Sequence, residues 1–483
     1  MQYAQMTLAV DPERTEFLYQ QVVDLIGDRI EGGDLRPGDR LPSLRKMSRT
    51  LEVSIPTVRQ AYIELERHGR VEARPKSGYY VRARQRRELV RPGCKSCEPR
   101  PVNRLSLVER VYEAIHRPGY VPFGIANPSM ALPASKALHR TMRRIMTRSE
   151  DRSLGYAEMT GEPTLKRQLA HRFLQLGGDI PAKDILITNG GQEALSIALL
   201  SVCKPGDVVA VESPTYHGLL ELLEANGMLA LEIETCPTAG IVLSALERAL
   251  DRHRVAACIF SSVLNNPLGA ATTDDYRREL VALLEQRRIP LIEDDVYGDL
   301  LYAGSRPRPA QFLSRSGLVL TCGSFSKTVA PGYRIGWLLP GKYGEAARRH
   351  KRSLSCSSGL LQQLTLADFL ASGEFERHLR RLLPVLERNA NRMSALVAEH
   401  FPAATRVSHP AGGSVLWIEL PKGHDSAAVF NAALDHGISI APGLISAPSD
   451  RYRNFIRLSY GHPWTEDVEQ ALKTLGSLIT RMR

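Results

Sequence analysis

The chain has 483 residues, of which 43% are apolar and 24% are charged, and this length allows about three domain-sized units with large cores. Its net charge of +11 permits a polyanionic partner without requiring one. Seven cysteines argue against a disulfide framework, the first ten residues lack the pattern of a signal peptide, and no apolar run approaches the ~18 residues of a membrane span, so we expect a cytoplasmic protein.

The N-terminal segment has the pattern of a winged helix-turn-helix. Apolar residues at helical spacing predict three helices: Leu18–Glu31, roughly Leu44–Leu51 after an N-cap at Ser43, and a third that begins after Ser54 and ends at Gly69. On the third helix we expect four residues to face inward: Val58, Ala61, Tyr62 and Leu65. Two short strands, Val71–Ala73 and Tyr79–Arg82, follow as a hairpin. This layout places the third helix for a DNA major groove.

The same segment resembles the GntR family of DNA-binding domains. The resemblance is carried by Leu35–Arg45 (LRPGDRLPSLR), Thr57–Tyr62 (TVRQAY) and Ser77–Val81 (SGYYV). It implies DNA contacts from two helices and from the hairpin wing: Arg45, Thr57 and Arg59, and Lys76, Ser77 and Gly78. Ile55-Pro56 replaces the polar pair common in the family, so we assign it no base contact.

Charge alone does not establish DNA binding for this domain. Residues 1–84 hold 14 basic and 12 acidic side chains, so the basic ones must gather on one face to bind phosphates. A small helical module that binds a protein is the alternative interpretation.

Residues 85–104 are predicted to be a linker. Basic side chains alternate there with Pro92, Pro99 and Pro101, and there is little to bury, so we expect a semi-stiff segment that attracts the DNA backbone. Cys94 and Cys97 form a CxxC pair, but no His or Cys follows at zinc-finger spacing. The pattern therefore favours two incidental thiols over a metal or redox site, and we expect no metal.

From residue 105 to the end, helical patterns alternate with short apolar runs, which predicts an α/β domain with a parallel sheet. The five runs are Asp184–Thr188, Val208–Glu212, Ala256–Ser261, Pro290–Glu293 and Gly317–Thr321. Ligands bind beyond the carboxyl ends of the strands in open α/β sheets. We therefore expect the residues that follow these runs to share one site.

The last run leads into a loop that can hold a phosphate and present an amine. Ser324 and Ser326 supply hydroxyls and Arg334 a guanidinium, while Lys327 carries the amine. A lysine amine forms a Schiff base with a carbonyl cofactor such as pyridoxal 5′-phosphate (PLP). The alternative for this loop alone is a surface position with a solvated lysine.

The other four runs end in residues that suit the same cofactor. Gly191-Gln192 opens a helix whose bare N–H groups suit a phosphate, and Tyr216 can stack on a flat ring. Asn266 can donate to a phenolic oxygen, Asp294 can pair with a protonated ring nitrogen, and Tyr297 can reach the same ring. Taken singly, these residues also fit a plain turn, a core tyrosine, a helix cap or a metal ligand.

The chain from about Pro122 to Arg483 resembles the fold-type I aminotransferases, PLP enzymes of the aspartate aminotransferase class. The resemblance implies a large α/β domain followed by a smaller α+β lobe from about residue 341. It also implies a catalytic set in which Lys327 holds PLP covalently, Asp294 pairs with the pyridine nitrogen and Tyr216 stacks on the ring. The other implied cofactor contacts are Asn266, Tyr297, Gly191, Gln192, Ser324, Ser326 and Arg334.

Two further roles come from the same resemblance. Tyr156, in GYAEMTG, corresponds to a tyrosine that reaches the phosphate across a dimer interface. Arg457, in NFIRLSY, corresponds to the arginine that clamps a substrate α-carboxylate, a role for which a guanidinium is well suited.

A GntR domain joined to an aminotransferase-like domain is the arrangement of the MocR subfamily of bacterial regulators. The resemblance implies a homodimer that binds operator DNA and responds to PLP, to an amine or to an amino acid. We interpret the chain as a PLP-dependent transcriptional regulator. Because no member of the catalytic set is missing, an active class I/II aminotransferase with an appended DNA-binding module is the alternative.

Overall fold

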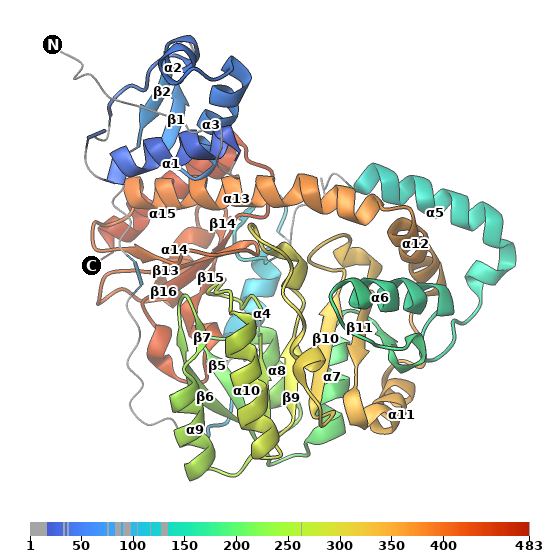
Figure 1. Ribbon diagram of the computed structural model, residues 1–483. Helices are drawn as coiled ribbons and strands as arrows, with labels where there is room; N and C mark the ends of the chain where they lie inside the picture. Colours follow the sequence, from blue (N-terminus) through green and yellow to red (C-terminus); the bar gives the residue numbers. More distant parts are fainter. Residues whose placement is uncertain are drawn as a thin grey trace. The chain divides into compact units, whose positions relative to one another are not determined.

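The computed structural model describes residues 17–31, 34–35, 38–74, 77–82, 88–89, 98–103, 105–115, 117–126, 134–261 and 263–482 (Figure 1). The chain divides into two compact units, Met1–Arg86 with Glu387–Glu399 and Arg87–Leu386 with His400–Arg483, and each is described by itself. No helix within the described ranges is long and apolar enough to cross a membrane.

The first unit contains three helices and a hairpin: α1 (Leu18–Glu31), α2 (Leu44–Leu51), α3 (Ile55–Arg67), β1 (Val71–Arg74) and β2 (Gly78–Val81). Ser43 Oγ accepts from the N–H of Lys46 at 3.3 Å, and Ser54 Oγ accepts from the N–H of Thr57 at 3.2 Å. These bonds satisfy N–H groups that a helix start leaves without partners. The inward stripe of α3 is buried as predicted: Val58, Ala61, Tyr62 and Leu65. The predicted winged-helix order is thus confirmed.

An eight-stranded sheet, ordered β4-β11-β10-β9-β8-β5-β6-β7, organises the second unit. Its strands are β4 (Leu186–Thr188), β5 (Val208–Ser213), β6 (Leu229–Cys236), β7 (Gly240–Ile241), β8 (Val255–Phe260), β9 (Leu291–Asp294), β10 (Val319–Ser324) and β11 (Gly336–Leu339). The five predicted strands are all present. The first begins later than predicted because Ala182–Asp184 form a 3₁₀ turn.

The sheet is mixed rather than purely parallel. β6, β5, β8, β9 and β10 pair in parallel, whereas β11 is antiparallel to both of its neighbours, β10 and β4. β4 therefore points in the same direction as the parallel strands. As a result, the five predicted strands all end at the same edge of the sheet, where the expected site lies.

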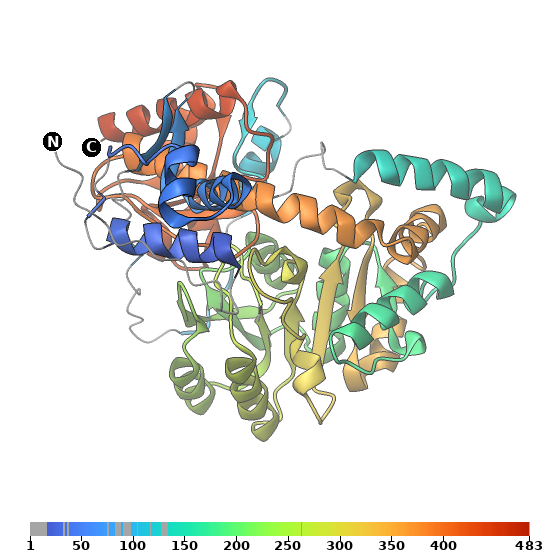
Figure 2. The same ribbon diagram turned by 45° about the horizontal axis from the view of Figure 1, so that its top comes forward.

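Helices cover both faces of this sheet (Figure 2). They are α6 (Pro163–Gln175), α7 (Gly191–Val202), α8 (His217–Ala225), α9 (Leu243–Arg252), α10 (Asp274–Gln286) and α11 (Gly344–Leu354), with α5 (Ser135–Ser149) and α12 (Leu360–Ala371) at the β4 end. Alternate residues of β5 point to opposite faces: Val209 and Val211 pack with α7 and α8, and Ala210 packs with α9 and α10. Figures 1 and 2 both show α9 and α10 side by side.

A smaller lobe follows, with a four-stranded antiparallel sheet ordered β12-β13-β16-β15. Its elements are β12 (Arg406–Val407), β13 (Val415–Glu419), α14 (Ser426–Leu434), β14 (Ile438–Ser439), β15 (Ala441–Pro442), β16 (Phe455–Ser459) and α15 (Glu466–Arg481). The preceding helix, α13 (Glu374–His400), is divided between the units, because its residues Glu387–Glu399 belong to the first one. β3 (Val121–Pro122) pairs in parallel with β14, so the chain that precedes the large lobe is tied to the small one. The predicted α+β lobe is present, but its predicted start at about residue 341 is wrong, because α11 and α12 pack against the helices of the large lobe.

Part of the predicted linker is packed against the large lobe, contrary to the expectation that it has little to bury. Arg100 and Ala230 of β6 exchange two backbone hydrogen bonds, at 3.0 and 2.9 Å. Val102 is buried in the core cluster that contains α7 and α8. The burial of Val102 and the backbone hydrogen bonds of Arg100 thus attach this basic, proline-containing segment to the large lobe. α4 (Leu105–Ile115) begins shortly after this docked segment.

Candidate functional site

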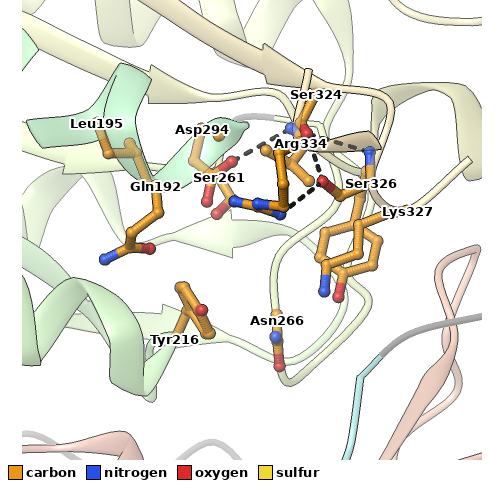
Figure 3. Close-up of a pocket in the computed structure, with 13 residues that line it drawn as sticks. Gln192, Leu195, Tyr216, Ser261, Asn266, Asp294, Ser324, Ser326, Lys327 and Arg334 are labelled. Atoms are coloured by element: carbon orange, nitrogen blue, oxygen red, sulfur yellow. Dashed lines mark hydrogen bonds between the residues drawn. The ribbon is translucent and has the colours of Figure 1, made fainter. Parts of the chain in front are cut away.

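Residues from five strand ends meet in one pocket of the second unit (Figure 3). Ten residues predicted for the cofactor line it: Gly191, Gln192, Tyr216, Asn266, Asp294, Tyr297, Ser324, Ser326, Lys327 and Arg334. Leu195, Ser261 and Val296 line it as well and were not predicted. Ser261 directly follows β8, so the strand-end rule that found the others could have found it, whereas no sequence signal marks Leu195.

One end of the pocket is an anion cup, formed by Ser324, Ser326, Arg334 and the start of α7. Ser324 Oγ donates to Ser326 Oγ at 2.9 Å, and Arg334 Nη1 donates to the same oxygen at 3.3 Å (Figure 3). α7 begins at Gly191, beside Ser324, and no side chain in the described part of the chain caps it, so its first N–H groups are left for a ligand or water. Two hydroxyls, a guanidinium and a helix N-terminus form a donor set suited to a phosphate.

Two glycines allow this close approach. Gly190 has φ +83°, and a Cβ placed there would lie 2.4 Å from Arg334 Nη2. A Cβ on Gly191 would lie 2.9 Å from Val296 Cγ2. A larger residue at position 190 would be strained at this φ and would displace the Arg334 guanidinium, and one at position 191 would displace Val296, so both glycines help to shape the cup.

The pocket also carries an amine, Lys327, and a carboxylate, Asp294. Burial, together with the nearby Arg457 and Arg334, lowers the pKa of Lys327 to about 7, although Asp294 opposes this shift. Burial raises the pKa of Asp294 to about 6, against the N–H of Val296, which donates at 3.2 Å, and the charge of Lys327. Lys327 can therefore present a neutral, nucleophilic amine near neutral pH.

Arg457 is held at the same site by the small lobe. It lies on β16, is only 2% exposed, and donates to Asn266 Oδ1 at 3.3 Å and to the carbonyl of Gly124 at 2.8 Å. Its Nε has no hydrogen-bond partner among the described residues. Burial lowers the pKa of Arg457, and the groups that oppose this shift are phenols rather than carboxylates. A buried guanidinium without a carboxylate partner is suited to an anionic ligand.

Tyr156 is not brought into this pocket. Its side chain is 91% exposed. Its predicted role across a dimer interface therefore remains a prediction, since a single chain contains no such interface. No group of three or more His, Cys, Asp or Glu residues that could hold a metal occurs in the described part of the chain. Cys94 and Cys97 lie outside it.

In the first unit, the predicted DNA-contacting residues of the helices lie at the surface. Arg45 on α2 and Arg59 on α3 are exposed. Thr57 is half-buried, and its Oγ1 lies 2.7 Å from Ser54 Oγ. The Thr57 hydroxyl thus also takes part in capping α3, so a contact from it to DNA would be made from the helix start.

The wing residues lie at the turn between β1 and β2. Ser77 Oγ lies 2.7 Å from Tyr80 Oη, and Gly78 has φ +113°, a left-handed conformation that favours glycine. Arg74 lies over the ring of Tyr80, 4.3 Å from its centroid. Lys76 lies outside the described residues.

Two family models match this chain. Residues 122–475 match the aminotransferase class I and II family, and residues 18–81 match the gntR family of bacterial regulatory proteins. The two matches coincide with the two arrangements described above: a winged helix, and an α/β unit with a pocket at its strand ends.

Relatives of two kinds are similar to the chain. It is 36% identical over 464 residues to the uncharacterized HTH-type transcriptional regulator YjiR of Escherichia coli K12, covering 96% of this chain and 99% of the relative. It is 26% identical to the 2-aminoadipate transaminase of Thermus thermophilus, covering 77% and 94%. Among solved structures, LysN, an α-aminoadipate aminotransferase of Thermus thermophilus, has a TM-score of 0.71 at 25% identity, covering 77% of this chain and 97% of that one.

Proposed function

The chain belongs to the aminotransferase class I and II family and has the GntR–aminotransferase arrangement of the MocR-type regulators, and we propose that it is a DNA-binding transcriptional regulator that holds PLP and senses an amine, an amino acid or PLP itself. The observation that carries this proposal is the presence of a complete cofactor pocket and a winged helix on one chain. A regulator that acts on DNA would work in the cytoplasm, beside the bacterial chromosome.

The pocket fits PLP. The anion cup matches the charge of a phosphate, and the glycines at the start of α7 leave room for it. Asp294 would pair with the ring nitrogen, Tyr216 would stack on the ring, and Asn266 and Tyr297 would face the ring hydroxyl. Lys327 would hold the cofactor covalently through its amine. When bound, PLP supplies an electron sink for chemistry on an amine.

Arg457 is the proposed contact for an amino-acid effector. A ligand carboxylate would give the buried guanidinium the charged partner that the described residues do not provide. Because Arg457 lies on the small lobe and Lys327 on the large lobe, a ligand that contacts both would bridge the lobes. Binding across two lobes commonly favours their closure.

We propose a homodimer in which Tyr156 of each subunit reaches the phosphate in the other. Its 91% exposure in a single chain supports this role, because a large aromatic side chain so exposed is suited to an interface. Analytical ultracentrifugation would measure the oligomeric state. A protein that is monomeric in this measurement and still binds PLP tightly would contradict the role of Tyr156.

Footprinting beside the protein's own gene, with and without PLP, tests the proposed function. We expect a protected operator whose occupancy changes when PLP or an amine is added. An assay with pyruvate or 2-oxoglutarate and a range of amino acids tests the alternative of an active aminotransferase. Turnover in that assay, together with DNA binding that no ligand alters, would favour the enzyme over the regulator.

A further inference from the structure

Tyr112 lies on α4, which is not one of the elements that form the pocket, and contacts His217, the neighbour of the pocket residue Tyr216. Its hydroxyl lies 3.2 Å from His217 Nε2, and the two rings meet edge to face with centroids 5.7 Å apart. His217 in turn packs edge to face against Tyr216, which lines the pocket, with centroids 4.8 Å apart. α4 is thus connected by aromatic contacts to the ring proposed to stack on the cofactor.

Tyr112 also belongs to the electrostatic surroundings of Arg457. The groups that oppose the lowering of the Arg457 pKa are three phenols: Tyr297, Tyr216 and Tyr112. Tyr297 and Tyr216 line the pocket; Tyr112 is not a lining residue but lies within electrostatic reach of the same guanidinium. Burial and the charge of Glu221 raise the pKa of Tyr112, whereas a hydrogen bond with Tyr216 and the charge of Arg457 lower it. Its hydroxyl stays protonated near neutral pH and can donate a hydrogen bond.

His217, which contacts both Tyr112 and Tyr216, is buried and neutral, and one of its ring nitrogens makes no hydrogen bond within the described residues. Burial and the charges of Arg457 and Lys327 lower its pKa well below the ordinary value, so it carries no charge at neutral pH. Its Nδ1 has no hydrogen-bond partner among the described residues. Both the ligand-holding arginine and the reactive lysine therefore lie within electrostatic reach of the Tyr112–His217 pair.

α4 is at the same time attached to the small lobe. Val108 packs in a cluster with Ala441 and Ile445. Arg110 Nη2 donates to Asn431 Oδ1 at 2.5 Å, and the guanidinium lies over the ring of Phe430, 5.5 Å from its centroid. Tyr112 lies 41% exposed on this helix. α4 thus touches the large lobe through Tyr112 and the small lobe through Val108 and Arg110.

We propose that Tyr112 is a ligand-contacting residue: with His217 it forms the polar wall that meets the carboxylate end of an amino acid joined to PLP, and it passes occupancy of the site to α4. The inference rests on the proposed function, because it assumes that the pocket holds PLP. A ligand carboxylate at Arg457 would lie among the three phenols, where the Tyr112 hydroxyl can donate to it. α4 would then be held against both lobes when the site is filled.

The test uses Tyr112→Phe in the full-length protein, because this change removes only the hydroxyl. The matched control is Tyr343→Phe, a partly buried tyrosine that packs elsewhere on the large lobe. The probes are PLP and two stable conjugates, N-(5′-phosphopyridoxyl)-L-alanine and N-(5′-phosphopyridoxyl)-ethylamine, which differ only in the carboxylate. Calorimetry on cofactor-free protein gives the three dissociation constants.

We expect Tyr112→Phe to weaken the alanine conjugate roughly 10- to 150-fold, the loss typical of one hydrogen bond to a charged group, and to leave PLP and the ethylamine conjugate unchanged. Amide exchange over residues 105–115 should slow when the alanine conjugate binds the wild type or Tyr343→Phe, and should slow less in Tyr112→Phe. Equal affinities of wild type and Tyr112→Phe for the alanine conjugate, or α4 exchange that the conjugate leaves unchanged, would overturn this inference alone. A wild-type protein that does not bind PLP would overturn the proposed function as well.

Discussion

The winged unit and the pocket of the second unit, the two regions expected to bind ligands, differ in where their charged side chains lie: at the surface in the first and in buried positions in the second. In the winged unit, Arg45 and Arg59 are exposed on helices whose buried faces hold the fold together. In the second unit, Lys327 and Asp294 line the pocket and Arg457 lies beside it, bonded to Asn266, and burial is the largest influence on the pKa of each. Exposed charges suit a polyanion whose position is set by many weak contacts, whereas buried charges suit one small ligand.

The difference determines how each region responds to substitution. Removal of an exposed arginine loses one contact among many, and salt screens much of its effect. Removal of a buried charged side chain leaves the opposite charge beside it in a low-dielectric site without a partner, which costs free energy. We therefore expect larger effects from changes in the pocket than from changes on the winged surface.

The largest expected effect is the loss of covalent cofactor attachment in Lys327→Ala. Borohydride reduction of the PLP-loaded wild type should fix PLP on Lys327, and mass spectrometry should find the modified peptide. The variant should show no fixed PLP but should retain some cofactor through Asp294 and the anion cup. Lys342→Ala, which changes an exposed lysine, is the control and should label as the wild type does. Fixed PLP on another lysine in Lys327→Ala would contradict the assignment.

Next in size is an effect on the pH dependence of stability without cofactor. The pKa of Lys327 is about 7 in the folded protein, whereas an ordinary lysine has a pKa of 10.5, so between these pH values the unfolded chain binds one more proton at this position. Stability therefore rises with pH across this window. Lys327→Met removes the free-energy cost of burying this amine, so the variant should be more stable than the wild type by on the order of a few kcal/mol near pH 7.

Chemical denaturation at several pH values measures this prediction. The stability gap between Lys327→Met and the wild type should shrink steadily as the pH rises from about 7 towards 10.5. Lys342→Met should show no such gap. A gap that stays constant with pH would mean that Lys327 is not deprotonated by its surroundings.

Arg457→Ala should weaken an amino-acid ligand while leaving PLP and basal DNA binding nearly intact. A hydrogen bond to a charged group contributes about 1.5–3 kcal/mol, which corresponds to roughly 10- to 150-fold in affinity. Arg453→Ala, an exposed arginine paired with Asp425 at 2.8 Å, is the matched control. If PLP itself is the effector, the regulatory response should survive in Arg457→Ala and change in Lys327→Ala. Titration of each variant with PLP and with amino acids separates these outcomes.

The smallest of these effects is expected on the winged surface. Arg59→Ala should cost about 1–3 kcal/mol and relax sequence preference if the side chain reads a base, and should mainly reduce the salt dependence if it contacts a phosphate. Arg29→Ala, on α1 and paired with Asp34 at 2.9 Å, is the control. Band-shift titrations at several salt concentrations distinguish these cases. Unchanged binding after both Arg45 and Arg59 are replaced would count against these helices as the DNA reader.

Much of this organisation could be predicted because its signals are local. Ser43 and Ser54 mark helix starts by their own side chains, and each pocket strand is a short apolar run with a polar residue after it. Parallel strands then bring those polar residues to one edge, so a one-dimensional pattern predicts a three-dimensional site.

What could not be predicted depends on contacts between distant segments. Tyr112 precedes the large lobe by many residues, and only packing brings its hydroxyl to His217. The backbone pairing of Arg100 with Ala230 could not be predicted either, because the composition of the linker does not indicate which distant segment its backbone contacts. The antiparallel β11 was not predicted because a short buried apolar run does not reveal the direction in which it pairs.

The claim that the two regions act together is tested most directly by measuring one coupling from both sides. Operator affinity is measured with and without a saturating amine ligand on the PLP-loaded protein, and ligand affinity is measured with and without operator DNA. Because linkage is reciprocal, the two factors should agree, and a coupling of typical size would be about 5- to 150-fold. Operator affinity that neither PLP nor any amine changes would contradict the regulatory function and leave the aminotransferase alternative in its place.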